Sequence, residues 1–140
     1  MVISLSDFDK SFFQTIDGHE KIRFVSKGIY HIILIDDKKA GVVGYIPTQN
    51  SKGEKLNFVQ IVLCPEFRGK RITKLAEDLL AKTYKLPNLY ATIDNDNIAS
   101  LKAHKKADFK ELNLKTINAL QKNGFLQAKQ TRLRKIYHLF

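Results

Sequence analysis

Hydrophobic residues recur along this chain at two spacings, one typical of amphipathic helices and the other typical of buried strands. Apolar residues three or four positions apart predict helices over Asp7–Ile16, Arg71–Tyr84, Asn95–Lys106 and Asn113–Asn123. Short apolar and β-branched runs between turn residues predict strands over Ile22–Ser26, Tyr30–Ile35, Ala40–Ile46, Phe58–Cys64, Leu89–Ile93 and Thr131–Leu139. This mixture of strands and helices predicts a fold of the α/β or α+β class.

The predicted strands are connected by recognisable turn and loop signals. The residues Asp-Asp-Lys-Lys at 36–39 lie between two apolar runs, which indicates a β-hairpin. A polar loop, Thr48–Lys55, then leads to the run FVQIVLC at Phe58–Cys64. Because this run is apolar at almost every position, it is typical of a strand that is buried on both faces and has a parallel neighbour.

The predicted helices carry their own boundary signals. Ser6 is placed to cap the first helix and Asp96 or Asn97 to cap the third, since their side-chain oxygens can accept a free N–H group of the first turn. Gly124 is placed to end the fourth helix. The second helix is expected to bury one stripe, made of Ile72, Leu75, Ala76, Leu79, Leu80 and Thr83.

Composition limits the class of protein. A chain of 140 residues with 44% hydrophobic and 27% charged residues is the size of one globular domain, expected to span residues 1–140. No apolar run approaches the roughly 18 residues that a membrane-spanning helix needs, and the N-terminus has no signal-peptide pattern. Cys64 is the single cysteine, so no disulfide can form within the chain. These features predict a cytoplasmic protein without a membrane partner.

The formal net charge of +10 is concentrated toward the C-terminus. From Ala99 onward there are ten lysines and arginines against two acidic residues, whereas the rest of the chain has fourteen against twelve. Such a segment indicates a polyanionic partner, which could be a phosphate-rich cofactor, a nucleic acid or an acidic protein. The same charge is also compatible with a lysine-rich surface that has no partner.

The segment VLCPEFRGKRIT at residues 62–73 has the chemistry of a phosphate site. It joins the end of a buried strand, a basic loop with a glycine, and the start of a long helix. The first turn of a helix has unpaired N–H groups and the positive end of the helix dipole, so it stabilises a phosphate. Gly69 would let the backbone approach closely, and Thr73 could donate a hydroxyl hydrogen bond. The alternative is a plain strand–turn–helix connection with exposed basic residues.

This segment resembles the signature of the GNAT superfamily of acyl-CoA N-acyltransferases. In that family, the loop follows the pattern Q/R-x-x-G-x-G/A, and its backbone amides hold the pyrophosphate of CoA. Here Arg68 keeps the first position, Arg71 replaces the usual glycine, and Thr73 replaces the usual glycine or alanine. These departures leave the backbone donors in place, but they crowd the loop and add side chains that could contact phosphate.

A second segment resembles the later motif of the same family, N-x-x-A/S-x-x-x-Y-x-x-x-G-F. Asn97, Ser100 and Phe109 match this motif. His104 stands at the tyrosine position, and Asp108 at the glycine position. The residues at 97, 100 and 104 would share one face of a helix and line one groove.

The second motif also fits another register. The stretch NLKTINALQKNGF at residues 113–125 has the same spacing and ends in Gly-Phe. Its tyrosine position is Leu120, which has no proton to donate. The register at Asn97 is preferred because it directly follows a predicted strand, as in the family. The helix Asn113–Asn123 is then an insertion before the last strand.

The resemblance implies a fold, an activity and a site. The GNAT fold is a central mixed, mostly antiparallel sheet with one splayed pair of parallel strands, flanked by helices. The implied activity is direct transfer of an acetyl group from acetyl-CoA to an amine of an unidentified acceptor, without a metal. A backbone N–H near Leu63 would polarise the thioester carbonyl, and His104 would protonate the thiolate of CoA. The residues implied to bind CoA are Val62, Leu63, Cys64, Arg68, Gly69, Lys70, Arg71, Ile72, Thr73, Asn97, Ser100 and His104.

The group that removes the proton of the amine is left open. Relatives often place a glutamate on the central strand, but Phe58–Cys64 has none. Glu54, Glu66 and Asp94 are near the motifs in sequence, and a chain of water molecules would also serve. Cys64 could instead accept the acyl group as a nucleophile. A cysteine that ends a buried strand is, however, more often part of the core.

Two other functions fit the sequence. The altered loop and the missing tyrosine are compatible with a module that binds acyl-CoA without turnover. The basic C-terminal third would permit docking on nucleic acid or a ribonucleoprotein, although it contains no nucleic-acid motif. Its interleaved basic and aromatic residues are Phe125, Arg132, Arg134 and Tyr137.

The net charge also bears on the acceptor. It argues against a strongly cationic acceptor such as a polyamine, unless acidic residues gather at the mouth of the acceptor site. The candidates for such a gathering are Asp36, Asp37, Glu54, Asp94 and Asp96. The protein is expected to act as a monomer or a homodimer.

Overall fold

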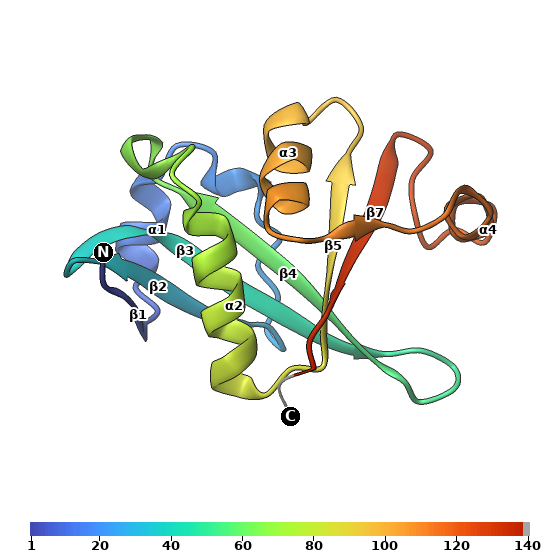
Figure 1. Ribbon diagram of the computed structural model, residues 1–140, viewed down its shortest axis with the longest axis horizontal. Coiled ribbons are helices and arrows are strands. Elements are labelled where there is room, and N and C mark those ends of the chain that lie inside the picture. The colour runs from blue at the N-terminus through green and yellow to red at the C-terminus, as the bar shows by residue number, and fades with distance from the viewer. Residues whose placement is uncertain (139–140) are drawn as a thin grey trace.

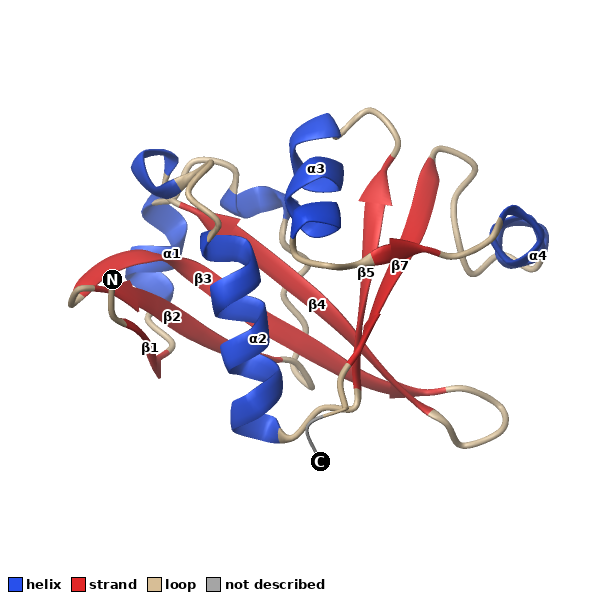
Figure 2. Ribbon diagram, in the orientation of Figure 1, coloured by secondary structure: helices blue, strands red, loops and turns tan. Residues whose placement is uncertain are grey.

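The computed structural model describes residues 1–138, which form a seven-stranded mixed sheet with helices on both faces (Figures 1 and 2). The strands are β1 (Ile3–Asp7), β2 (Ile29–Ile35), β3 (Lys38–Gln49), β4 (Lys55–Leu63), β5 (Asn88–Asp94), β6 (Lys110–Glu111) and β7 (Gln130–Ile136). The helices are α1 (Lys10–Thr15), α2 (Ile72–Tyr84), α3 (Ile98–Lys106) and α4 (Leu114–Lys122), with 3₁₀ turns η1 (His19–Lys21) and η2 (Pro65–Phe67).

The sheet has the strand order β1-β2-β3-β4-β5-β7-β6, and β4 and β5 are its parallel pair. The other neighbouring strands pair in antiparallel fashion. β4 and β5 meet at Phe58 and Tyr90, and beyond this point they diverge toward their C-terminal ends (Figure 2). The predicted sheet with one splayed parallel pair is therefore confirmed. The divergence opens a gap in the middle of the sheet.

Each face of the sheet has its own hydrophobic core. On one face, α2 covers a core that includes Val43, Leu80 and Leu133. On the other face, α1 covers a smaller core that includes Phe13 and Val42. Neighbouring residues of a strand point to opposite faces, so Val42 and Val43 enter different cores although they are adjacent in sequence.

Helix α2 is confirmed, but its buried stripe is rotated from the predicted one. Leu75 is 39% exposed and Thr83 is exposed, whereas Glu77 is fully buried. Thr73 is also buried. The reason is that α2 contacts α3 as well as the sheet, so the two neighbours together bury a face that the apolar residues alone do not define.

The N-terminal third contains three errors of prediction. Ile22–Ser26 is not a strand, and β1, which was not predicted, is the edge strand beside β2. Two backbone groups of the 22–26 segment bond a side chain instead of a neighbouring strand: the hydroxyl of Tyr30 accepts from the Val25 N–H and donates to the Arg23 carbonyl. The first helix is capped by Asp9 rather than Ser6, and so begins later than predicted.

The remaining predicted elements form, with two differences. β6 was not predicted, and β3 and β4 are longer than predicted, so that they pair within the predicted loop Thr48–Lys55. The hairpin of β2 and β3 turns at Asp36 and Asp37, both at positive φ, as a two-residue type I′ turn requires. Asn97 caps α3, which begins at Ile98 rather than Asn95. β7 ends at Ile136, and the predicted strand end at Leu139 lies outside the described residues. Within residues 1–138, no helix has both the length and the hydropathy needed to cross a membrane.

Candidate active site

A cavity of about 990 Å³ occupies the gap between β4 and β5. It is lined by both strands, the first turn of α2, one side of α3, the segment between α1 and β2, and the segment before β7. The predicted site residues that line it are Val62, Leu63, Arg68, Thr73, Asn97, Ser100 and His104. The two motifs, separated in sequence by β5, therefore meet at one cavity.

The other predicted site residues lie elsewhere. Gly69, Lys70 and Arg71 are exposed in the loop before α2. Cys64 and Ile72 are buried in the two cores. Burial raises the pKa of the Cys64 thiol, because it disfavours the charged thiolate. The environment of Cys64 is thus that of a core residue and opposes a role as nucleophile.

The loop before α2 leaves the first turn of the helix open to a ligand. Gly69 and Arg71 both have positive φ, 74° and 63°, which folds the chain tightly before the helix begins. Arg71 is the N-cap residue, and its side chain makes no capping hydrogen bond. The N–H groups of the first turn therefore have no side-chain cap, which is the condition that a phosphate site at this helix start requires.

The N–H of Leu63 points into the gap between β4 and β5. The Cys64 N–H donates to the Ala40 carbonyl on β3, whereas the Asn57 N–H donates to Asn88 at the start of β5. Along a strand, successive N–H groups alternate in direction, so odd-numbered residues of β4 direct theirs toward β5. Because β4 and β5 have separated at this level, the Leu63 N–H faces the cavity. This is the geometry required of the predicted donor to a thioester oxygen.

Arg68 braces the loop from within. Its Nε donates to the Leu63 carbonyl at 3.0 Å, and its Nη2 donates to the Asp17 carbonyl at 2.7 Å. A carboxylate oxygen of Asp17 lies 3.8 Å from Nη1. The Arg68 side chain thereby connects the end of β4 to the turn after α1. It positions these two segments and also lines the cavity.

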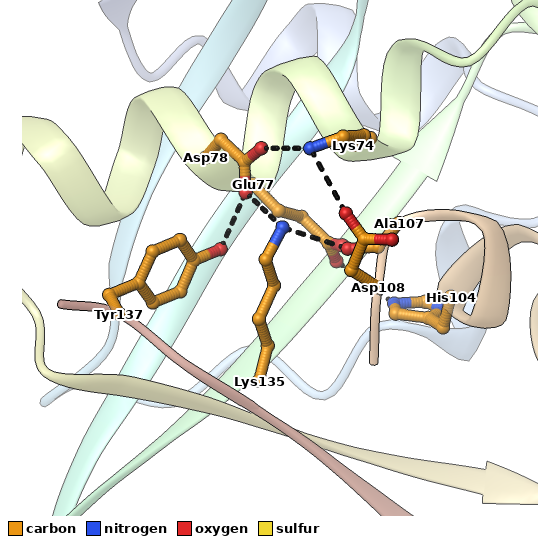
Figure 3. A network of polar contacts seen from close by, with 8 residues as sticks. All are labelled: Lys74, Glu77, Asp78, His104, Ala107, Asp108, Lys135 and Tyr137. Carbon is orange, nitrogen blue, oxygen red and sulfur yellow. Dashed lines mark hydrogen bonds and ion pairs between the residues drawn. The ribbon is translucent and has the colours of Figure 1, made fainter. Parts of the chain in front are cut away.

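His104 is held in a buried pair with Glu77 of α2 (Figure 3). The imidazole is 4% exposed, and the Glu77 carboxyl is fully buried. Nε2 lies 2.9 Å from Glu77 Oε2, and Nδ1 lies 2.9 Å from the Ser100 carbonyl oxygen and 3.4 Å from Ser100 Oγ. Among residues 1–138, nothing forms a hydrogen bond with Glu77 Oε1.

These contacts require that the pair carries a proton. A carbonyl oxygen only accepts, so Nδ1 must hold one hydrogen, and the bond between Nε2 and Glu77 needs another. The pair is therefore either imidazolium with carboxylate or imidazole with carboxylic acid. Burial by itself lowers the pKa of His104, but the charge and hydrogen bond of Glu77 and the bond to Ser100 outweigh it. The pKa of His104 is raised above its usual 6.5.

This raised pKa predicts a pH dependence of stability. The folded state binds the His104 proton more tightly than the unfolded chain does, so the contribution is fully present below about pH 6.5. It should be lost as pH rises through the higher pKa of the folded state. Urea denaturation of the protein between pH 6 and pH 8.5 should show a falling free energy of unfolding. His104→Gln should flatten this slope, and an unchanged slope in that variant would contradict the assignment.

A second polar network fixes α2 against β7 (Figure 3). Asp78 accepts from Lys74 at 2.9 Å, from Lys135 at 2.7 Å and from the Tyr137 hydroxyl at 2.8 Å. Lys135 also donates to the Ala107 carbonyl just after α3. The network connects α2, β7 and the end of α3, which surround the buried pair. It thereby fixes the position of Glu77 on α2 relative to His104 on α3.

The carboxylates considered as bases lie in different places. Asp94 lines a second cavity of about 580 Å³, which shares Thr92, Ile93, Asn97, Ser100 and other residues with the first. Asp96 lines the same second cavity. Glu54 is in the β3–β4 turn and Glu66 is in η2, both exposed. Asp36 and Asp37 form the β2–β3 turn and do not line either cavity.

The basic and aromatic residues proposed for nucleic-acid docking do not share one surface. Phe125 and Arg132 line the first cavity, whereas the Tyr137 hydroxyl is bonded to Asp78. Arg134 is exposed. The structure therefore distributes these residues between the cavity, the α2–β7 contact and the open surface.

Several residues of the site were missed by reasoning from sequence. Glu77 lies four positions after Thr73 and three before Leu80, on the buried face of α2. This helical spacing was the one sequence signal that Glu77 is buried. Phe58 and Arg132 line the cavity from β4 and β7, and only the pairing of strands brings them together. Within residues 1–138, no three His, Cys, Asp or Glu side chains are grouped so that they could hold a metal ion.

Comparisons with known proteins agree with this arrangement. Residues 5–110 match the model of the family described as "Acetyltransferase (GNAT) domain", a range that includes Asn97 and ends before Asn113. A search of curated proteins found no significant match to the sequence.

Solved structures show the same fold. The N-acetyltransferase PseH of Campylobacter jejuni, solved with acetyl coenzyme A, superposes with a TM-score of 0.64 at 13% identity. The alignment covers 96% of this chain and 99% of PseH. The GNAT domain of S. lividans PAT gives a TM-score of 0.68 at 11% identity, over 96% of this chain and 89% of that domain. The chain therefore belongs to the GNAT family, and it is an acetyl-CoA-dependent N-acetyltransferase.

Proposed function

We propose that the protein transfers the acetyl group directly from acetyl-CoA to an amine that enters the gap between β4 and β5. The observation that carries this proposal is that the Leu63 N–H, the open first turn of α2, and Ser100 with His104 all border one cavity. The pyrophosphate of CoA would lie at the start of α2, where the N–H groups are free. The thioester would then lie beside Leu63.

The proposed step balances as a single acyl transfer. The amine nitrogen attacks the thioester carbonyl, and the Leu63 N–H stabilises the negative charge that develops on its oxygen. The C–S bond breaks, and CoA leaves as a thiolate. His104 protonates that thiolate through Ser100 Oγ, because Nδ1 lies 3.4 Å from this hydroxyl and Ser100 lines the cavity. The products are the N-acetylated acceptor and CoA with a free thiol.

Asp94 is proposed to receive the proton of the amine through water. Its carboxylate accepts a hydrogen bond from Gln130 at 3.3 Å and lines the second cavity, next to Thr92 and Ser100. This position supports Asp94 over Glu54 and Glu66, which lie in exposed turns. A cytoplasmic location and a monomeric or homodimeric state stay predictions.

Catalysis and sensing are separated by one assay. The protein is mixed with acetyl-CoA and a panel of primary amines, and released thiol is followed with a chromogenic disulfide while calorimetry measures acetyl-CoA affinity. Amine-dependent thiol release is expected. Tight acetyl-CoA binding without thiol release on a broad panel would instead favour a sensing module.

Reversing a charge in the loop before α2 should weaken cofactor binding. Lys70 is exposed beside the open first turn, so Lys70→Glu is expected to raise the Kd for acetyl-CoA roughly 10-fold at low salt, and less at 0.5 M salt. Lys115→Glu is the matched control, because Lys115 is exposed on α4 and the net charge changes equally. Equal effects of both substitutions would show that net charge, not the loop, determines affinity.

A further inference from the structure

Arg132 is a cation in the cavity wall, and the described part of the chain gives it no carboxylate partner. It lies on β7 opposite Thr92 of β5. Its Nε and Nη2 donate to the Thr92 hydroxyl at 3.2 and 3.0 Å, and Nη2 also donates to the Phe125 carbonyl at 3.3 Å. Within residues 1–138, no Asp or Glu oxygen lies within 4.0 Å of its guanidinium, and no acceptor is bonded to Nη1.

Two other cations near the site, Arg68 and Lys135, do have carboxylate partners. Arg68 lies 3.8 Å from Asp17, and Lys135 lies 2.7 Å from Asp78. Arg132 instead has its guanidinium carbon 4.8 Å from the centre of the Phe58 ring. Desolvation lowers the pKa of Arg132, yet a guanidinium stays charged at neutral pH. A partly desolvated cation without a counter-charge is unfavourable, and an anionic ligand would relieve that cost.

Arg132 faces the side of the cavity away from the proposed CoA-binding elements. On β7, its neighbour Leu133 points into the core under α2, so Arg132 points to the opposite face of the sheet. Thr73, Ser100 and His104 reach the cavity from the α2–α3 face. Arg132 therefore lies where the acceptor, rather than the pantetheine arm, would enter.

The walls around Arg132 are suited to an acceptor of moderate size. Phe58 underlies the guanidinium, and Phe125 lines the cavity while remaining 70% exposed. Lys21, Arg23 and Lys27 line the cavity from the segment between α1 and β2. The same segment also contributes Asp17 and Glu20, so the acceptor side of the gap combines apolar surface with charges among which the cations are in excess.

We infer that the natural acceptor is a small-molecule amine that carries a carboxylate or phosphate group, and that Arg132 binds this anionic group across Phe58. The inference rests on the proposed acetyl transfer and specifies its substrate class. It also accounts for the excess of cations over Asp17 and Glu20 in the cavity lining, which favours an anionic group on the acceptor. Arg132 acts here as a residue that selects the acceptor, while Leu63, Ser100 and His104 act on the thioester.

The test compares matched amines that differ in their anionic group. Phosphoethanolamine is compared with ethanolamine, and several amino acids are compared with their amides. For the wild type, kcat/KM should be higher for the anionic member of the preferred pair. Arg132→Gln should lower that kcat/KM roughly 10- to 100-fold and leave the neutral member within about twofold, because only the charged contact is lost. Arg132→Lys should recover part of the loss.

Arg134→Gln is the matched control, since Arg134 lies two residues along the same face of β7 but is exposed. Arg134→Gln should change kcat/KM by no more than about twofold for either the anionic or the neutral amine. Equal kcat/KM for anionic and neutral amines in the wild type, or equal losses for both in Arg132→Gln, would overturn the inference.

Direct binding keeps this inference separate from the proposed catalysis. Phosphoethanolamine, ethanolamine and the amino acid pairs are titrated calorimetrically into protein saturated with CoA. Binding of an anionic amine that is lost in Arg132→Gln and kept in Arg134→Gln would support the inference even without turnover. If CoA binds but no anionic amine binds better than its neutral partner, the inference is wrong. Absent thiol release despite such binding would instead count against acetyl transfer.

Discussion

Replacing His104 by leucine should lower the free energy of unfolding by about 3–5 kcal/mol, because it leaves a buried carboxylate without its partner. Glu77 is 0% exposed, and its Oε2 atom is bonded to His104 alone among the described residues, while Oε1 has no partner. Burying an unpaired charge is far less favourable than burying a hydrogen-bonded pair. Urea denaturation at pH 7, followed by circular dichroism, measures the loss.

Two further variants identify the cause of that loss. In Glu77→Leu/His104→Leu, both charged groups are replaced by apolar side chains, so most of the stability should return. Lys102→Leu is the control on the same helix, since Lys102 is exposed and its change should stay within about 0.5 kcal/mol. If the double variant is as unstable as His104→Leu, packing rather than the orphaned carboxylate is responsible.

Removing the Ser100 hydroxyl should lower kcat roughly 100-fold, within the range measured for general acids, and should change the Kd for acetyl-CoA far less, because Ser100 is one of many residues in the cavity wall. Both imidazole nitrogens of His104 are occupied, so the hydroxyl 3.4 Å from Nδ1 is its route to the cavity. Ser100→Ala keeps the backbone N–H that Asn97 caps, so α3 should still form. Steady-state kinetics with a fixed amine, together with calorimetry for acetyl-CoA, measures both quantities.

The pH profile gives a second readout of the same step. In the wild type, kcat should fall as pH rises through the raised pKa of His104, because the acid is then deprotonated. Ser100→Thr keeps a hydroxyl and should retain activity and the alkaline fall, whereas Ser100→Ala should lose both. A normal kcat in Ser100→Ala would mean that water or another group protonates the thiolate.

The buried pair Glu77–His104 underlies both the expected loss of stability and the expected loss of kcat. Glu77 raises the pKa of His104 and fixes its ring, and the Asp78 network holds α2 against β7 and the end of α3. Both features cost desolvation free energy that an apolar pair would not. The charged pair Glu77–His104 nevertheless lies in the cavity wall. This position agrees with the proposed role of the pair, which is to keep a proton near the leaving thiolate.

Local patterns predicted most of the elements because each depends on residues close in sequence. The 3.6-residue spacing placed α2, α3 and α4, and the Asp36–Asp37 turn placed the hairpin of β2 and β3. The spacing within the two motifs likewise placed Thr73, Ser100 and other residues at one site. One error arose at residues 22–26, where the Tyr30 hydroxyl bonds the Val25 N–H and the Arg23 carbonyl, a side-chain contact that the apolar pattern does not reveal.

The resemblance to the GNAT family rested on residues within two motifs, 62–73 and 93–109, so it needed no tertiary structure. The buried face of α2 could not be predicted from sequence, because it depends on packing against α3. That packing buries Glu77 beside His104. The acceptor side of the cavity could not be predicted either. It forms because β7 pairs with β5 across about forty residues, which brings Arg132 next to Thr92 and Phe58. Charges and aromatic rings that are remote in the chain become one site only when strands pair and layers pack.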